Sequence, residues 1–351
     1  MNILGYDGDP ASALFCVFDG HGGPEVARYC SEVFPEKLSV CLKGVDFSDD
    51  DAVKAALVQA YIATDDSLLE GPGLARLQAI SGADGLQSGG MNSRNIGCTA
   101  VTAFIKGAKL YVANAGDSRC ILSRGCGELV ELSEDHKPEL QCEHDRIVAA
   151  GGYVTAGRVN GNLNLTRCIG DHVYKKPELP HAKQIISCVP DVRVVDLGAA
   201  DPDFLVLACD GIWDVMDNIN VVNFVRKRLL PEDRSRDDAA DDSGRLDAIN
   251  RRPLEPVPWP ADAAEGSLVK ALELTARQAV DKSLASESRF GIGCDNMSFL
   301  LVLFKTGNYG KSVLEALESA PKKEKEEEEE KKEEGMKVEV KEKEEVKKDE
   351  E

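Results

Sequence analysis

Hydrophobic and polar positions along the chain predict a mixed fold in which strands and helices occur in groups. Residues 11–18 form a short apolar run that ends in Asp19-Gly20, which indicates a buried strand entering a turn. We expect Pro24 to begin a helix that runs to about Leu38. From residue 50 to about 69, apolar residues recur at helical spacing and predict a second, amphipathic helix.

Strand patterns dominate the next part of the chain. Short β-rich runs between about residues 98 and 132 predict an antiparallel meander. The remaining predicted elements are a helix at 139–150, strands near 153–166, 185–196 and 203–209, helices at about 218–230 and 267–285, and a last strand at 297–305. Strands in runs and helices in pairs indicate an α+β fold with sheets packed together under helices, and they do not fit a regular βαβ repeat.

Three segments lack a pattern that predicts a core. Residues 71–95 are rich in Gly and Ser, and residues 231–266 are polar and rich in Pro, so we predict a flexible insertion at each place. Residues 321–351 consist mainly of Lys and Glu and are predicted to form a disordered, solvated tail. We therefore expect one folded domain over residues 1–310, followed by the charged tail.

Composition narrows the class of protein. The chain has 351 residues, 42% of them hydrophobic, and no apolar stretch of the roughly 18 to 20 residues that a membrane helix needs. With no signal sequence recognisable, we expect an intracellular protein of the cytoplasm, the nucleus or both. The 11 cysteines are scattered without a Cys-x-x-Cys pair and are expected to be reduced and mostly buried. A net charge of -20 argues against a nucleic-acid partner, whereas a basic protein could bind the acidic tail.

Three aspartates occur in matching surroundings. Asp19 in "FCVFDGHGG" and Asp210 in "LVLACDGIWD" each end a buried strand, and Asp295 in "GCDNMSFLLVLF" begins one. Such carboxylates at the rim of a sheet repel one another unless a cation joins them, so their convergence would imply a metal. Oxygen ligands without a His or Cys cluster favour Mg²⁺ or Mn²⁺ over zinc. Asp117 and Asp214 are further carboxylates that could join the site.

Each of these residues also has an ordinary structural explanation. Asp-Gly after a strand is among the commonest turn signals, and His21 alone is more often a surface or capping histidine than a catalyst. Asp117 can equally cap a turn beside Arg119. Taken singly, no residue establishes a function.

Eight motifs follow one another over about residues 12–305: "DGHGG", "GCTAV", "ANAGDSR", "EDHKP", "GRVNGNLNLTRCIGD", "VPDV", "ACDGIWD" and "GCDNM". Taken together, in order and approximate spacing, they resemble the motifs of the type 2C protein phosphatases. Acidic segments like those of this chain recur in the gamma-type branch of that family. The resemblance implies a four-layer αββα sandwich, in which two antiparallel sheets are flanked by helices and divalent ions bind at one edge. It also implies hydrolysis of phosphoserine and phosphothreonine in proteins.

The resemblance assigns roles to particular residues. Six positions match the metal ligands of the family: Asp19 as the bridge between two Mg²⁺ or Mn²⁺ ions, the Gly20 carbonyl on one ion, Asp210 and Asp295 on the other, and Asp117 and Asp214 at a weaker third site. Two ions about 4 Å apart would activate a water to attack phosphorus. His21 resembles the general acid that protonates the leaving oxygen, while His136 in "EDHKP" is expected to be structural.

One part of the family pattern cannot be assigned. Family members carry Gly-Trp-Arg and Met-Glu-Asp elements more than twenty residues before "DGHGG", and only 18 residues precede Asp19 here. Those elements would supply a glutamate metal ligand and a phosphate-binding arginine. Two hypotheses follow: an active phosphatase whose true start lies upstream, or a catalytically impaired phosphatase-like binding or scaffold protein. An acidic chaperone for basic proteins is a third. The presence of Asp19, His21, Asp210 and Asp295 favours the first, because a scaffold has no chemical need for all four.

Overall fold

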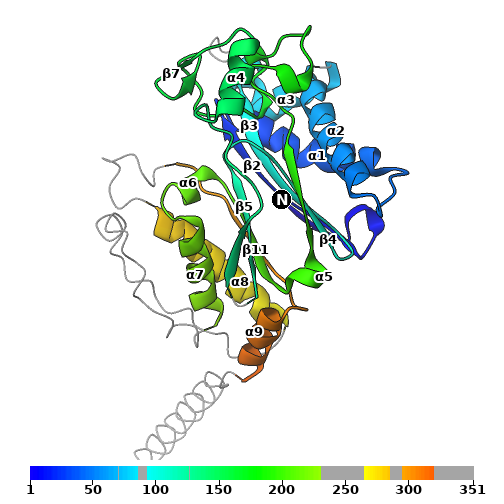
Figure 1. Cartoon of the computed structure of the whole chain (residues 1–351), viewed down its shortest axis with the longest axis vertical. Coiled ribbons are helices and arrows are strands. Elements are labelled where there is room, and N and C mark those ends of the chain that lie inside the picture. Colours follow the sequence, from blue (N-terminus) through cyan, green and yellow to red (C-terminus); the bar gives the residue numbers. More distant parts are fainter. Residues whose placement is uncertain (70, 86–92, 126, 231–264, 285–294, 320–351) are drawn as a thin grey trace, which may run out of the picture.

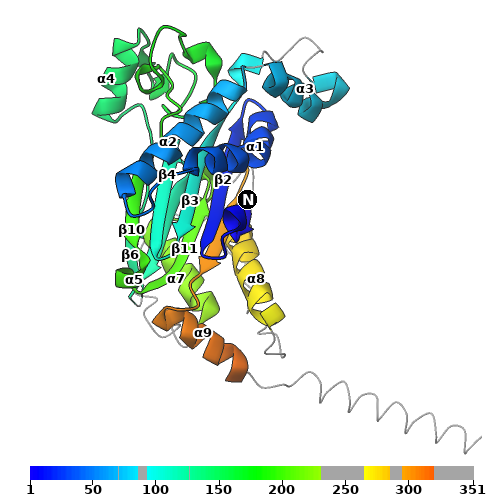
Figure 2. The same cartoon turned by 90° about the vertical axis from the view of Figure 1, so that its right-hand side faces the viewer.

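Two antiparallel β-sheets pack face to face, and helices cover their outer faces (Figure 1). The structure is a computed structural model that describes residues 1–69, 71–85, 93–125, 127–230, 265–284 and 295–319. Helices α1 and α2 lie against the first sheet and α7 and α8 against the second, which Figure 2 shows from the side. This arrangement confirms the α+β, four-layer αββα sandwich.

The first sheet has the order β1-β2-β3-β4-β10, with β9 paired to β3. Its strands are β1 (Asn2–Leu4), β2 (Ser12–His21), β3 (Gly97–Lys106), β4 (Lys109–Ala115), β9 (Ile169–Gly170) and β10 (Asp191–Asp196). The second sheet has the order β12-β11-β5-β6. Its strands are β5 (Arg119–Arg124), β6 (Glu128–Glu131), β11 (Pro202–Ala208) and β12 (Phe299–Leu303), and a separate hairpin joins β7 (Val154–Thr155) to β8 (Arg158–Val159).

Helices account for most of the remaining described chain. They are α1 (Glu25–Leu42), α2 (Asp50–Ser67), α3 (Gly71–Gly85), α4 (Gln141–Ala149), α5 (Leu197–Ala200), α6 (Asp210–Trp213), α7 (Asn218–Leu229), α8 (Glu265–Ser283) and α9 (Asn308–Ser319). Asp49 begins α2 as its N-cap, because its side chain accepts the backbone N–H groups of Asp51 and Ala52. None of the helices in the described ranges is long and apolar enough to cross a membrane.

Alternation along the strands builds the separate hydrophobic layers. In β2, Leu14 packs with the helices α1 and α2, whereas Phe15 packs against the second sheet. In β11, Phe204 packs with the helices of the second sheet, whereas Leu205 faces the first sheet. Successive side chains of a strand point to opposite faces, so strands that are apolar on both faces become the inner layers of the sandwich.

The expected meander between residues 98 and 132 was wrong in its pairing. β3 and β4 pair in the first sheet, whereas β5 and β6 pair in the second. The chain crosses between sheets at Gly116, whose φ of 128° lies in a region that other residues rarely adopt. Strand patterns do not reveal which sheet a strand joins, and this crossing places Asp117 at the edge of the sandwich.

Helices α3 and α9 correct the sequence predictions at two further places. Residues 71–95 were expected to be a flexible insertion, but Gly71–Gly85 form α3, in which Leu77 is buried and Ile80 packs on the same core. Apolar residues three apart thus outweigh the Gly and Ser content. Helix α9 was not predicted, although Tyr309 and Val313 are buried in the core of the second sheet. Of the insertion predicted at 231–266, residues 231–264 lie outside the described residues, as does the tail at 321–351, whereas Glu265 and Gly266 begin α8.

A small lobe that follows β6 is held together by buried charge. The carboxylate of Glu143 in α4 is 1% exposed and accepts hydrogen bonds from Arg146 Nη1 at 2.6 Å and Arg167 Nη2 at 2.7 Å. The hydroxyl of Thr166 donates to the same carboxylate. Burial alone would raise the pKa of Glu143, but the hydrogen bond from Arg167 and the charges of both arginines lower it from 4.5 to about 2.

We therefore predict that Glu143→Gln destabilises the protein by about 3 kcal/mol, because it leaves two arginines without their buried partner. The depressed pKa means that the ionised carboxylate stabilises the fold above about pH 4.5, and that this contribution disappears as the pH falls toward about 2. Urea unfolding of parent and variant between pH 7 and pH 2.5 measures the difference. A gap that stays constant over this range would show that the charge of Glu143 does not stabilise the lobe.

Candidate active site

The acids that the sequence singles out meet at one edge of the sandwich. Asp19 lies near the end of β2 in the first sheet, and Asp210 begins α6 directly after β11 in the second. One ligand atom each from Asp19, Asp210 and Cys209 lie within 4.8 Å of one another. Gly20 follows Asp19 in β2 and pairs with Cys98 of β3. Strands of two facing sheets therefore end at the same place and bring these carboxylates together.

Asp117, Asp214 and Asp295 complete the cluster. Burial, together with the charges of Asp295 and Asp117, raises the pKa of Asp19 to about 6. Burial, together with repulsion from Asp117, Asp19, Asp295 and Asp214, raises the pKa of Asp210 to about 7. Burial and the neighbouring acids also raise the pKa of Asp214, although Lys137 and Arg119 oppose the shift. The structure thus brings all five predicted carboxylates together, and their charges repel one another.

These residues fit a hard divalent cation. Asp210 Oδ1 is buried and has no hydrogen-bond partner among the described residues. The donor set is almost entirely carboxylate oxygen, which suits Mg²⁺ or Mn²⁺. Burial raises the pKa of the neighbouring Cys209 thiol to about 12, so this sulfur stays protonated and is a poor ligand for a metal.

Lys137 contributes a positive charge that the sequence prediction missed. Its Nζ donates a hydrogen bond to Asp117 Oδ2, and the Asp117 side chain is 3% exposed. Burial lowers the pKa of Lys137, but the charge of Asp117 and the hydrogen bond raise it to above its usual value. Asp117 is therefore paired within the protein, unlike Asp210 Oδ1. The "EDHKP" motif contained this lysine, but its partner lies twenty residues away in sequence.

His21 stands beside the acids with a partner of its own. Its Nε2 lies 2.5 Å from Asp171 Oδ2, and the side chains are 25% and 1% exposed, respectively. Burial lowers the pKa of His21, but the bond to Asp171 and the charges of Asp171, Asp117 and Asp19 together raise it above its usual value. The imidazolium form, which can donate a proton, is thereby favoured. Asp171 ends the "TRCIGD" motif, and the sequence analysis gave it no role.

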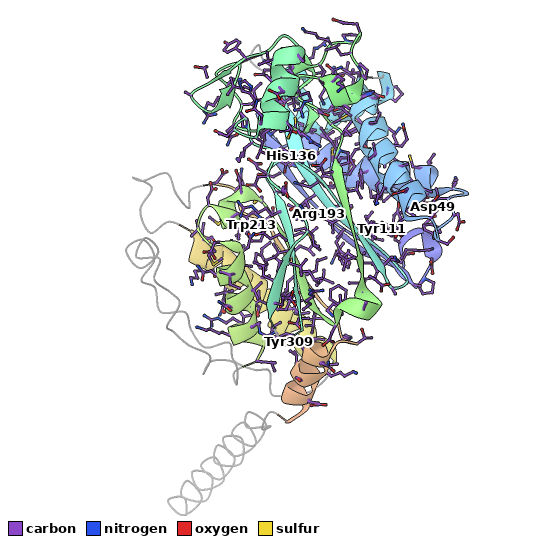
Figure 3. The ribbon with its side chains drawn as sticks, in the orientation of Figure 1. Asp49, Tyr111, His136, Arg193, Trp213 and Tyr309 are labelled. Atoms are coloured by element: carbon purple, nitrogen blue, oxygen red, sulfur yellow. The ribbon has the colours of Figure 1, made fainter. Side chains whose placement is uncertain are left out.

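His136 has a structural environment, as expected. It is buried, its Nδ1 accepts the N–H of Gly116 at 3.1 Å, and its Nε2 lies 3.1 Å from Asp191 Oδ2. Figure 3 places His136 and Trp213 toward the same end of the sandwich, with Tyr309 at the other end. His136 therefore supports the crossing between the sheets.

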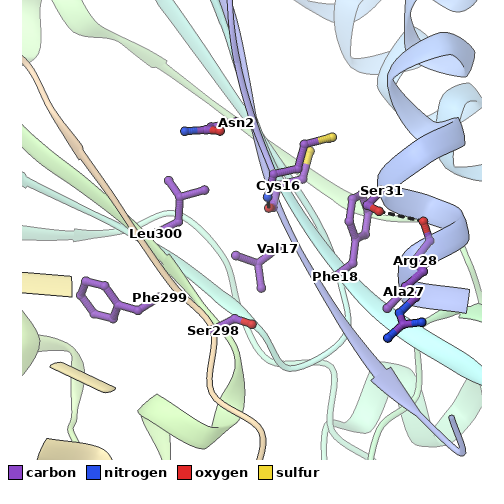
Figure 4. Close-up of a pocket in the computed structure, with 11 residues that line it drawn as sticks. Asn2, Cys16, Val17, Phe18, Ala27, Arg28, Ser31, Ser298, Phe299 and Leu300 are labelled. Carbon is purple, nitrogen blue, oxygen red and sulfur yellow. Dashed lines mark hydrogen bonds between the residues drawn. The ribbon is translucent and has the colours of Figure 1, made fainter. Parts of the chain in front are cut away.

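A cavity of about 540 Å³ opens behind the site, between the edges of the two sheets. Figure 4 shows β2 on one side and β12 on the other. Its lining comprises Met1, Asn2, Cys16, Val17, Phe18, Ala27, Arg28, Ser31, Ser298, Phe299 and Leu300. None of the clustered acids lines this cavity, so it is distinct from the carboxylate site.

Comparisons with known proteins agree with this geometry. The family model for Protein phosphatase 2C matches residues 2–248. "Probable protein phosphatase 2C 21" of Arabidopsis thaliana is 34% identical over 332 residues, which cover 86% of this chain and 81% of the relative. "Protein phosphatase 2C homolog 2" of Schizosaccharomyces pombe is 35% identical over 302 residues, which cover 85% of this chain and 65% of the relative.

Solved structures show the same fold. A phosphatase from a pathogenic strain of Toxoplasma gondii is similar with a TM-score of 0.56 at 23% identity, over 84% of this chain and 85% of that one. A Caenorhabditis elegans sex-determining protein is similar with a TM-score of 0.60 at 22% identity, over 88% of this chain and 59% of that one. Sequence, fold and site agree, and the chain belongs to the protein phosphatase 2C family of metal-dependent protein serine/threonine phosphatases.

Proposed function

We propose that the carboxylate cluster holds two divalent cations, Mg²⁺ or Mn²⁺, for the hydrolysis of phosphoserine and phosphothreonine in proteins. Asp19 would contact both ions, the Gly20 carbonyl one of them, and Asp210 and Asp295 the other. Asp117 and Asp214 would form a weaker third site. The observation that carries the proposal is the gathering of five carboxylates at a buried Asp210 oxygen for which the described part of the chain offers no hydrogen-bond partner.

The chain and the cations divide the chemistry. When bound, the cations neutralise phosphate charge and make a water molecule more acidic. In hydrolysis, a water molecule releases a proton to solvent, its oxygen forms a bond to phosphorus, and the bond between phosphorus and the seryl or threonyl oxygen breaks. That oxygen takes the electron pair of the broken bond and a proton from His21, and His21 regains a proton from solvent. An unprotonated alkoxide is a poor leaving group, so proton donation by His21 lowers the barrier of this step.

In a second candidate function, the carboxylate site still binds cations, but the chain does not hydrolyse phosphoproteins. In this alternative the chain is a catalytically impaired, phosphatase-like protein that binds phosphoproteins without hydrolysing them. The two functions differ in one observable property. An impaired protein would bind cations and phosphopeptides but release no phosphate, whereas an active phosphatase would release phosphate in proportion to the bound cation.

We predict that phosphate release from a phosphothreonine peptide requires Mg²⁺ or Mn²⁺. The substitutions Asp19→Asn, Asp210→Asn and Asp295→Asn should each remove most of it, because each deletes a cation ligand with little change in volume. Asp51→Asn is the matched control, since Asp51 is an exposed acid of α2 whose side chain forms an ion pair with Lys54. Phosphate release is measured with excess chelator and after each metal is restored. Full activity in chelator, or in two of the three variants, would contradict the proposal.

The role of His21 predicts a dependence on the leaving group. His21→Gln should slow hydrolysis of an alkyl phosphate on the order of 100-fold or more, because an alkoxide needs the proton. It should slow an aryl phosphate far less, because a phenolate leaves without one. Turnover of both substrates at saturating Mn²⁺, together with Mn²⁺ affinity, measures this difference. Equal losses on both substrates with weakened Mn²⁺ binding would assign His21 a structural role.

A further inference from the structure

Asp171 has a buried carboxylate that does not cap the helical turn it precedes. It stands at the position that precedes a short helical turn, His172–Tyr174, where an aspartate usually caps the backbone N–H groups, but its side chain makes no capping hydrogen bond. Instead, its Oδ2 lies 2.5 Å from His21 Nε2 and accepts a hydrogen bond from Cys168 Sγ at 2.9 Å. The side chain is 1% exposed. A buried charge of this kind requires partners, and its partner across 150 residues of sequence is His21.

The backbone of Asp171 is held in a conformation that residues other than glycine rarely adopt. Its φ is 49°, and a left-handed conformation of this kind persists only where the surroundings enforce it. The N–H of Asp171 donates to Ile96 O at 2.9 Å, and the N–H of Gly170 donates to Asp65 Oδ1 at 2.7 Å. Lys175 Nζ bonds the same Asp65 oxygen at 2.6 Å. Helix α2 and the residue that precedes β3 together therefore fix the direction of the Asp171 carboxylate.

Gly97 provides the space in which the two side chains meet. A Cβ atom at this position would lie 2.7 Å from His21 Nε2 and still closer to Asp171 Oδ2, which is nearer than atoms can approach. The backbone of Gly97 has no positive φ, so alanine fits its conformation. Glycine is needed at this position because it has no side chain, and not because the backbone is unusual. Glycine at this point of β3 thus permits the contact between imidazole and carboxylate.

We infer that Asp171 is a positioning residue for His21: it fixes the ring by accepting the Nε2–H and leaves Nδ1 as the atom that gives a proton to the leaving oxygen. The inference rests on the proposed role of His21 as the proton donor. An aspartate hydrogen-bonded to a catalytic histidine holds the ring in one orientation and stabilises its cation, without itself taking the proton. A structural anchor for the lobe would instead act equally on every substrate.

The test compares the turnover of substrates with different leaving groups by two variants: Asp171→Asn, and Gly97→Ala, which keeps the charges of both His21 and Asp171. Asp171→Asn should slow hydrolysis of phosphoserine by about 10-fold or more, within the roughly 100-fold or greater effect expected for the acid itself, and should leave an aryl phosphate nearly unaffected. Gly97→Ala should give the same selective loss, because its methyl group separates the pair. A series of aryl phosphates with increasingly basic phenols should show a growing deficit in both variants.

Asp66→Asn is the matched control, because Asp66 Oδ1 bonds His181 Nε2 at 2.8 Å on the surface. It removes the charge from a similar pair and should not change the ratio of alkyl to aryl turnover. Thermal unfolding of each variant identifies losses that come from misfolding. If Asp171→Asn does not fold, Gly97→Ala, which keeps both charges, decides the question by the same ratio.

The double variant Asp171→Asn with His21→Gln separates the two proposals. If Asp171 acts through His21, the double variant should hydrolyse phosphoserine no more slowly than His21→Gln alone. Losses that multiply, or that are equal for alkyl and aryl substrates in both Asp171→Asn and Gly97→Ala, would overturn the positioning role while leaving that of His21 intact. Equal losses on both substrates in His21→Gln alone would instead overturn the proposed function of His21, and the positioning role with it.

Discussion

Mutual repulsion among carboxylates at one edge of the sandwich is the constraint on which the site depends. Burial, and after it the charges of the neighbouring acids, raise the pKa of Asp19 and of Asp210, so that each holds its proton at pH values where an isolated aspartate is ionised. Folding at neutral pH must gather these charges, and the hydrophobic layers between the sheets and under the helices supply the free energy to do so. A divalent cation bound among these acids would relieve the repulsion, in keeping with the metal dependence of the protein phosphatase 2C family.

The topology of the two sheets concentrates the chemistry at this edge. β2 and β11 belong to different sheets and end side by side, while the crossing at Gly116 delivers Asp117 to the same place. The lobe beyond β6 adds Asp171, and the N–H of the preceding Gly170 donates a hydrogen bond to Asp65 of α2. Rigid strands therefore position the charged ligands, and a loop held in place by hydrogen bonds positions the partner of His21.

The sequence predicted the layers and the acids because both depend on local patterns. Strands with apolar residues on both faces predicted buried sheets, and aspartates at strand ends predicted the cluster. The contacts of His21 with Asp171 and of Asp117 with Lys137 were missed, because neither residue pair is related by a helical or strand period. The pairing of β5 was also wrong, since a β-rich run does not specify its neighbour. Helix α3 was missed because its Gly and Ser content concealed the spacing of Leu77 and Ile80.

If bound cations relieve the repulsion among these acids, the unfolding temperatures of Asp210→Asn and of the parent should change order when metal is added at pH 7.5. Without metal the variant should unfold at a higher temperature than the parent, because one buried charge is gone. With saturating Mn²⁺ the parent should be the more stable, because it binds the cation more tightly. A variant that is less stable than the parent by the same margin in both conditions would show instead that Asp210 stabilises the fold without any cation.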